Sequence, residues 1–156
     1  MQNDLIVEDV TLASQCLRPD ATLQVTRGTM RLLGDMGYAA LTEFHLPNGR
    51  RADIAGLNTK GHLLIVEVKS CRQDFIADTK WADYADFCDM YFFAVNPAFP
   101  QEILPEGEGL ILADQFGAAI IRKAEEQPLK PARRKALTLS FARQAAHRLA
   151  RAETLA

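Results

Sequence analysis

The sequence predicts an α/β (α+β) fold in which helices flank a mixed β-sheet. Residues 63–68 and 90–95 are apolar at almost every position, which is typical of strands that are covered on both faces. A helical pattern separates these two segments, and a strand–helix–strand crossover places its strands parallel in one sheet. The predicted order is helix, three-stranded meander, helix and buried strand, followed by a C-terminal hairpin and helix.

The composition is that of a globular chain that can bury a core. With 156 residues, 48% of them hydrophobic, we expect a single domain over residues 1–156. Residues 1–20 are expected to form an N-terminal extension, and residues 132–152 a basic C-terminal helix. The start of the chain lacks the basic region of a signal peptide, and no apolar run is long enough to span a membrane. We therefore expect a cytoplasmic protein that does not contact a membrane.

The first predicted element is a helix that begins at Ala21 or Thr22 and ends near Met36. Gly37 follows it and is a common helix stop, because glycine readily adopts the left-handed conformation. The helix is expected to bury one apolar stripe, which consists of Leu23, Met30, Leu33 and Met36.

A strand over residues 38–46 leads into the turn Pro47-Asn48-Gly49, in which Asn-Gly is a strong hairpin signal. A two-residue Asn-Gly loop would pair Phe44 with Asp53 and would turn Glu43 toward the other face of the sheet. Only a bulge, or a loop with an odd number of residues, would bring Glu43 beside Asp53. Glu43 is thus an additional site candidate that depends on this register.

The next two strands carry charge in an apolar setting. If Thr59-Lys60-Gly61 forms a three-residue loop with its glycine in the left-handed conformation, Asp53 lies directly opposite Glu67. Because strand side chains alternate, Lys69 projects from the same face as Glu67, whereas Val68 points into the core.

Two opposed carboxylates need a compensating cation. At about 4 Å and an effective dielectric constant near 20 they repel each other by roughly 4 kcal/mol. Lys69 supplies one positive charge and a hard divalent ion would supply two, so Asp53 and Glu67 predict a site for Mg²⁺ or Mn²⁺. The carbonyl oxygen of Val68 is a candidate third ligand. The other interpretation is the polar face of an ordinary hairpin, since the short motif alone is a weak signal.

Residues 70–73 have the form of a capping box and predict a second helix that ends near Cys88. Its expected buried face consists of Ala77, Trp81, Tyr84 and Cys88. Lys80 and Tyr84 lie one turn apart and are further candidates for the site, although Tyr84 also fits the core. After the strand at 90–95, residues 109–113 and 118–122 predict a hairpin.

Basic residues gather near the C-terminus. Residues 130–156 contain seven Lys and Arg and one acid, whereas the rest of the chain contains eleven basic and nineteen acidic residues. The imbalance predicts a polyanion contact, and a solvated helix face explains it equally well. The candidate polyanion contacts are Arg133, Arg134, Lys135, Arg143 and Arg151, with His147 in the same row, and Arg50 and Arg51 beside the acids.

The acids and their surroundings resemble the PD-(D/E)xK nuclease superfamily, with Asp53 on the second strand and Glu67-Val68-Lys69 on the third. Within it, the chain is similar to the bacterial MmcB-type DNA-repair family, associated with resistance to mitomycin C. One departure is that Ala52, not Pro, precedes Asp53. The similar runs cover most of residues 25–151 and are Gly49-Arg50-Arg51-Ala52-Asp53, Ile65-Val66-Glu67-Val68-Lys69-Ser70, Asp74-Phe75, Lys80-Trp81, Cys88-Asp89, Phe93-Ala94-Val95 and Ala132-Arg133-Arg134-Lys135-Ala136.

The resemblance implies a restriction-endonuclease-like core and a metal-dependent DNA endonuclease, or nuclease-like repair factor, that acts on damaged or branched DNA. Asp53 and Glu67 would hold the metal, while Lys69 would orient the attacking water and offset transition-state charge. DNA, with other repair or replication proteins, would be the partner in a nucleoid-associated setting. The alternative is a non-catalytic DNA- or protein-binding module in which Lys69 is only a counter-ion.

Overall fold

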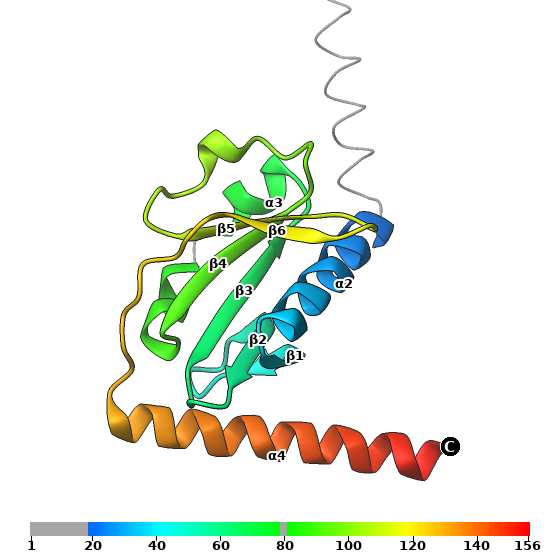
Figure 1. Cartoon of the computed structure of the whole chain (residues 1–156), viewed down its shortest axis with the longest axis vertical. Coiled ribbons are helices and arrows are strands. Elements are labelled where there is room, and N and C mark those ends of the chain that lie inside the picture. The colour runs from blue at the N-terminus through cyan, green and yellow to red at the C-terminus, as the bar shows by residue number, and fades with distance from the viewer. Residues whose placement is uncertain (1–18, 79–80) are drawn as a thin grey trace, which may run out of the picture.

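The structure is a computed structural model, and it describes residues 19–78 and 81–156. Most of the predicted N-terminal extension, residues 1–20, lies outside this part of the chain. No helix in the described ranges has the length and apolar character needed to cross a membrane. The elements are α2 (Pro19–Asp35), β1 (Tyr38–His45), β2 (Arg51–Asn58), β3 (Leu63–Lys69), α3 (Arg72–Ala77), η1 (Trp81–Phe87), β4 (Met90–Val95), η2 (Gln101–Ile103), β5 (Gly109–Ala113), β6 (Ala118–Arg122) and α4 (Pro131–Leu155) (Figure 1).

The six strands form one sheet in the order β1-β2-β3-β4-β5-β6. β1, β2 and β3 make an antiparallel meander, β3, β4 and β5 run parallel, and β6 returns antiparallel to β5. The crossover from β3 to β4 passes through α3 and η1, as expected for two parallel neighbours. The predicted fold class, a mixed sheet with flanking helices, is confirmed.

Helices cover both faces of the sheet, as the doubly apolar strands predicted. All seven residues of β3 and five of the six in β4 are buried. Val25 and Leu33 of α2 pack into the core cluster on one face. Leu137 and Phe141 of α4 pack into the other, where the rings of Phe141 and Phe44 are 5.7 Å apart. Figure 1 shows α2 against the sheet and α4 crossing one end of the molecule.

The apolar stripe predicted for the first helix is wrong at both ends. Leu23 and Met36 are 45% and 39% exposed. The buried residues of α2 are Val25, Gly28, Thr29 and Leu33. Gly28 explains this face, because a Cβ there would lie 2.8 Å from the carbonyl oxygen of Asp114. The close approach of α2 to the β5–β6 turn, rather than hydrophobicity alone, sets the rotation of the helix.

The second predicted helix is broken into two short pieces. α3 ends at Ala77, which is exposed rather than part of the buried face, and a 3₁₀ helix follows over Trp81–Phe87. Tyr84 is buried, as predicted. The backbone becomes extended at Asp78, whose carboxylate bonds to the Lys69 ammonium. This long-range contact competes with continuation of the helix.

A buried carboxylate ties three parts of the chain together at the start of β4. Asp89 is 1% exposed and accepts the N–H groups of Leu63 at 2.8 Å and Leu129 at 2.9 Å. Arg134 of α4 donates to both of its oxygens, at 2.7 and 2.6 Å. Burial raises the pKa of Asp89, but these hydrogen bonds outweigh it and lower the pKa to about 2.

Arg134 thus has an internal role, and its contact with DNA stays a prediction. Besides Asp89, its guanidinium donates to the carbonyl oxygen of Gly61 at 2.7 Å. Its neighbour Arg133 donates to the carbonyl oxygen of Asp86 at 3.0 Å and lies over the Phe87 ring. A basic pair that looks like one surface patch in the sequence is therefore engaged largely with the protein itself.

We predict that Asp89→Asn lowers the free energy of unfolding by about 3 kcal/mol at neutral pH, because it leaves the Arg134 guanidinium without its buried partner. The lowered pKa of Asp89 means that its contribution is present above its ordinary pKa of 3.8 and is lost as pH falls toward 2. Urea unfolding of wild type and variant, at neutral pH and near pH 2, measures the difference in the free energy of unfolding. Asp86→Asn, an exposed acid three residues earlier, is the control and should leave stability unchanged. Equal stability of Asp89→Asn and wild type would contradict the assignment.

Candidate functional site

The β2–β3 turn has the predicted geometry. Gly61 adopts a left-handed φ of +75°, and the ladder above it pairs Ile54 with Val66. Asp53 and Glu67 are the next positions outward and face each other across the two strands, as predicted.

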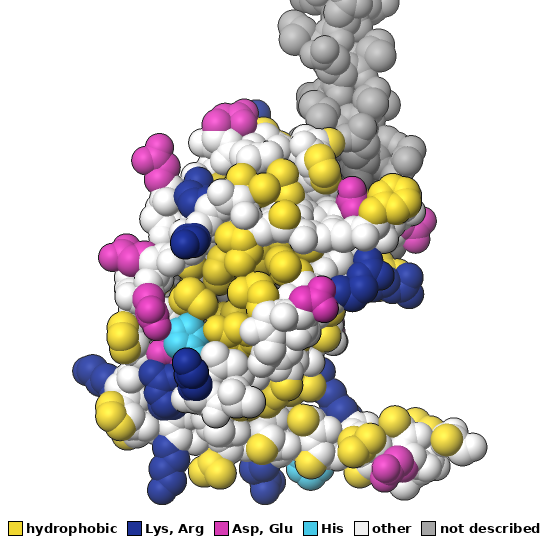
Figure 2. Space-filling model, viewed as in Figure 1, with side chains coloured by type: hydrophobic (Ala, Val, Ile, Leu, Met, Phe, Trp, Pro, Cys, Tyr) yellow, Lys and Arg dark blue, Asp and Glu magenta, His cyan; other side chains and the backbone are white. Residues whose placement is uncertain are grey.

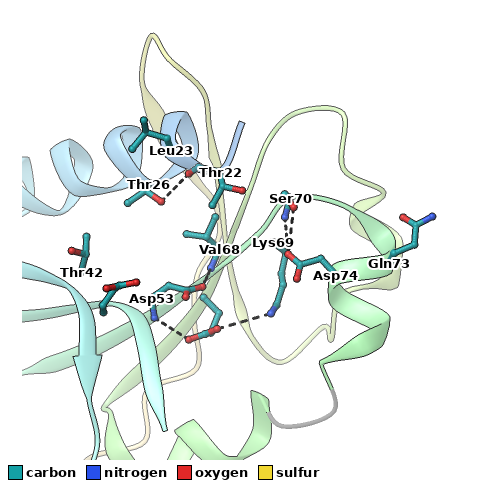
Figure 3. A pocket seen from close by; sticks show the side chains of 12 residues that line it. Thr22, Leu23, Thr26, Thr42, Asp53, Val68, Lys69, Ser70, Gln73 and Asp74 are labelled. Atoms are coloured by element: carbon teal, nitrogen blue, oxygen red, sulfur yellow. Dashed lines mark hydrogen bonds and ion pairs between the residues drawn. The ribbon is translucent and has the colours of Figure 1, made fainter. Parts of the chain in front are cut away.

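Backbone N–H groups orient both carboxylates. The Asp53 N–H donates to Glu67 Oε1 at 3.2 Å, and the Val68 N–H donates to Asp53 Oδ2 at 2.8 Å (Figure 3). These bonds to side chains stand where ladder bonds between β2 and β3 would otherwise continue. Each of these bonds occupies one oxygen of a carboxylate, Glu67 Oε1 or Asp53 Oδ2.

The β1–β2 turn is longer than predicted, which shifts the register of β1 by one residue. Residues 47–49 form a three-residue loop, which is closed by a bond of 2.9 Å from the Leu46 N–H to the Arg50 carbonyl oxygen. Gly49 adopts a φ of +82°, as this loop type requires. The predicted two-residue loop is wrong, because an Asn-Gly pair indicates a turn without determining its length.

Glu43 therefore stands opposite Asp53, and the expectation that it faces the other side is wrong. The flanking pairs are Thr42 with Ile54 and Phe44 with Ala52. Glu43 has a φ of +50°, which is uncommon for a residue with a side chain. This conformation interrupts the alternation of the strand, so that Leu41 and Phe44 pack against the same core cluster although three positions separate them.

Lys69 lies buried at the end of β3, on the face of Glu67 as predicted. Its Nζ donates to Asp78 Oδ2 at 2.6 Å and lies 4.0 Å from Glu67 Oε2. Sequence reasoning missed Asp78 as the nearest counter-ion. A signal was present, because Asp74 and Asp78 are four residues apart and would share one face of the predicted helix.

Asp74 holds the start of α3 next to these groups. Its Oδ2 accepts the Ser70 N–H at 3.1 Å and lies 3.5 Å from the Ser70 hydroxyl. The N-cap residue is Cys71 rather than Ser70, so the capping box expected over residues 70–73 is wrong. The acid in the first turn reaches back to an N–H group before the helix instead.

These side chains line a pocket of about 840 Å³. The meander contributes Glu43, Asp53 and Glu67, and the end of β3 contributes Val68 and Lys69. The start of α2 forms an unpredicted wall, which consists of Thr22, Leu23 and Thr26 (Figure 3). Leu23 is exposed at the start of α2 because its side chain lines this pocket.

Burial alters the ionisation of the site. It raises the pKa of Glu67 to about 8, and the charge of Asp53 adds to this effect. Burial also raises the pKa of Asp53, although the Val68 N–H and the Lys69 charge partly offset it. For Lys69, burial lowers the pKa, but the hydrogen bond and charge of Asp78 outweigh it and the net shift is upward. Both shifts disfavour the charged form, so the site resists carrying two negative charges at once.

Tyr84, a further site candidate on the predicted helix, is not part of this pocket. Tyr84 belongs to the core, and its hydroxyl donates to the carbonyl oxygen of Arg51 at 3.1 Å. Lys80 lies outside the described residues. Arg50 is at the surface and pairs with Asp83 at 2.9 Å.

The predicted basic row of the last helix is divided by the fold. Figure 2 shows Lys and Arg side chains along α4. Lys135, Arg143 and Arg151 are exposed. His147 and Arg151 line a second cleft, next to β1, whereas Arg143 does not.

Comparison with known proteins gives two matches. A solved structure of a protein of unknown function from Silicibacter pomeroyi is 45% identical to this chain, over 85% of this chain and 91% of that one, with a TM-score of 0.81. No curated protein matches. The family model described as DNA repair protein MmcB-like matches residues 9–156, which include the strands that carry Asp53 and Glu67. The chain therefore belongs to the MmcB-like family of DNA repair proteins.

Proposed function

We propose that this protein is a metal-dependent nuclease with a PD-(D/E)xK, restriction-endonuclease-like core, which hydrolyses phosphodiester bonds in damaged or branched DNA. One observation carries the proposal. Asp53 near the start of β2 lies beside Glu67 and Lys69 at the end of β3, and all three line one pocket. Packing alone gives no reason to bury Glu67 and Lys69 beside a half-buried Asp53, because desolvation of charged groups is unfavourable. Membership of a DNA repair family supports DNA as the substrate.

The oxygen atoms of the pocket fit Mg²⁺ or Mn²⁺. Mg²⁺ is commonly bound by one or two carboxylates and keeps several water molecules, so Asp53, Glu67 and the Val68 carbonyl oxygen would suffice. Within residues 19–78 and 81–156 no group of three His, Cys, Asp or Glu side chains is preformed to hold a metal. Glu43 lies in the same lining and would add a third carboxylate. When bound, the ion would polarise a phosphate oxygen and lower the pKa of a water molecule.

Lys69 would supply a fixed positive charge beside the reacting phosphate. The bond of 2.6 Å to Asp78 holds its ammonium group, and the strand end fixes the origin of its side chain. A cation that is already in place requires no reorganisation when charge develops in the transition state. Lys69 would also orient the attacking water.

A non-catalytic DNA- or protein-binding module is the second candidate. One observation favours it: Asp78 lies closer to the Lys69 ammonium than Glu67 does, at 2.6 Å against 4.0 Å. An internal ion pair would then neutralise Lys69, and the raised pKa of Glu67 would reduce the repulsion between the acids. In that case these residues would join β3 to α3 without needing a metal.

The metal is tested by titration calorimetry and by melting. We predict that Mg²⁺ or Mn²⁺ binds and stabilises the fold, by about 2.7 kcal/mol at a concentration 100 times Kd. Asp53→Asn should fold, and it should lose both the heat of metal binding and the metal-dependent rise in melting temperature. Asp83→Asn, an exposed acid outside the pocket, should keep both. A wild-type protein that gives neither heat nor shift has no such site.

The ionisation of Glu67 predicts an unusual pH dependence of the metal-free protein. Its folded pKa, about 8, is above its ordinary value of 4.5, so the folded state binds the proton more tightly. The stability contribution is thus present at low pH and is lost as pH rises from about 4.5 to about 8. Melting temperature should fall over this window in the wild type and fall much less in Glu67→Gln. Identical profiles would show that Glu67 ionises normally.

Catalysis is tested with single-stranded, duplex, flapped and four-way DNA in the presence of Mg²⁺, Mn²⁺ or EDTA. We predict cleavage of at least one of these that depends on metal, and a loss of about 10²-fold or more in Lys69→Ala. The variant should still fold and bind metal. Lys60→Ala, which removes an exposed lysine from the β2–β3 turn, is the control and should cut normally. If the wild type cuts none of these DNAs at any metal concentration, the binding module becomes the better account.

A further inference from the structure

A second cleft, of about 440 Å³, lies between β1 and the C-terminal half of α4. It shares Glu43 with the carboxylate pocket, so the two hollows adjoin. The lining residues are Glu43, His45, Gln144, His147, Arg148 and Arg151. Gln144 contributes an amide group to this lining, and Arg148 and Arg151 contribute two guanidinium groups.

Hydrogen bonds from α4 to the backbone of β1 hold the cleft in shape. The His45 N–H donates to Gln144 Oε1 at 3.0 Å, and Gln144 Nε2 donates to the His45 carbonyl oxygen at 2.9 Å. Arg148 donates to the carbonyl oxygen of Thr42 and, at 2.8 Å, to that of Glu43. α4 therefore bonds to the outer edge of the sheet on both sides of Glu43, and Gln144 and Arg148, which make these bonds, line the cleft.

The cleft is lined by two arginines, Arg148 and Arg151, and by one acid, Glu43. The hydrogen-bond partners of Arg148 are carbonyl oxygens, which leave the guanidinium charge intact. Among the described residues, no ion pair joins Arg148 or Arg151 to a carboxylate. The acid of the lining, Glu43, lies 3.6 Å from Arg51. Two uncompensated guanidinium groups in one hollow favour an anion, and guanidinium geometry matches phosphate oxygens.

We propose that this cleft binds a backbone phosphate of the same DNA strand whose scissile phosphate lies in the carboxylate pocket. The inference rests on the proposed function, because the adjoining pocket supplies the reason for a phosphodiester as the anion. Arg148 and Arg151 donate to the phosphate oxygens, and His147 adds a ring N–H. The contact reads the backbone only, so it is independent of base sequence.

Arg143 and Arg151 should differ in their contribution to DNA binding, whereas they would contribute equally if α4 were only a generally basic helix. Arg143 and Arg151 lie in the same row of α4, eight residues apart in the sequence. Both are exposed, but only Arg151 lines the cleft. A diffuse electrostatic surface would use both equally, whereas a built phosphate site depends on Arg151.

The test is fluorescence anisotropy with short labelled DNA, single-stranded and duplex, over a salt series in EDTA so that cleavage is absent. We expect the double variant His147→Ala/Arg151→Ala to weaken binding by about tenfold and to flatten the salt slope by about one unit per lost phosphate contact. Arg143→Ala should weaken binding by less than about twofold on the same scale. Lys123→Ala, an exposed cation outside both hollows, should change nothing.

Three other outcomes would contradict the proposed phosphate site. The wild-type protein could bind no DNA, the double variant could bind DNA as tightly as the wild type, or Arg143→Ala could lose as much DNA affinity as the double variant. A double variant that melts at a lower temperature with an unchanged salt slope would show that these side chains only pack the helix. If the variants follow the expected pattern but wild-type protein with Mg²⁺ or Mn²⁺ cuts no DNA, the nuclease proposal fails and the phosphate cleft stands.

Discussion

The pairing register of β1, β2 and β3 decides whether the carboxylates of this protein meet. Two three-residue turns set that register, with left-handed φ angles of +82° at Gly49 and +75° at Gly61. Because strand side chains alternate, a slip of one residue at either turn would move an acid to the other face of the sheet. The first turn places Glu43 opposite Asp53, and the second places Asp53 opposite Glu67. The three acids thus form one row across the meander.

Electrostatic repulsion makes this row of acids unfavourable by itself, and the groups around it offset that repulsion. A pKa of about 8 for Glu67 reflects how poorly the site accommodates a second negative charge. The N–H groups of Asp53 and Val68 each bond one carboxylate, and the Lys69–Asp78 pair places a cation beside them. The apolar strands supply the stability that tolerates this local conflict, since every residue of β3 is buried. Conflicts of this kind, in which burial and like charge perturb a pKa, are concentrated at functional sites.

Two anchors of different chemistry position α4. Near its start, Arg134 forms a bidentate pair with the buried Asp89. Further along, Gln144 and Arg148 bond to the backbone of β1 around the left-handed Glu43. The helix therefore reaches from the start of β4 to the edge of the carboxylate row. The same contacts divide its basic residues into those that hold the fold and those that remain at the surface.

Local patterns in the sequence determined the strands, their order and the opposition of Asp53 and Glu67, because side-chain alternation and a glycine-closed turn act over a few residues. Tertiary structure decided the rest. The rotation of α2 depends on the approach of Gly28 to the β5–β6 turn, which no apolar pattern encodes. The length of the β1–β2 loop, and with it the position of Glu43, depends on how β1 and β2 pack against the core and α4. The partners of Lys69 and the α4 arginines were also undetermined, because a charge pairs with whichever group the fold brings near, and sequence spacing does not measure that distance.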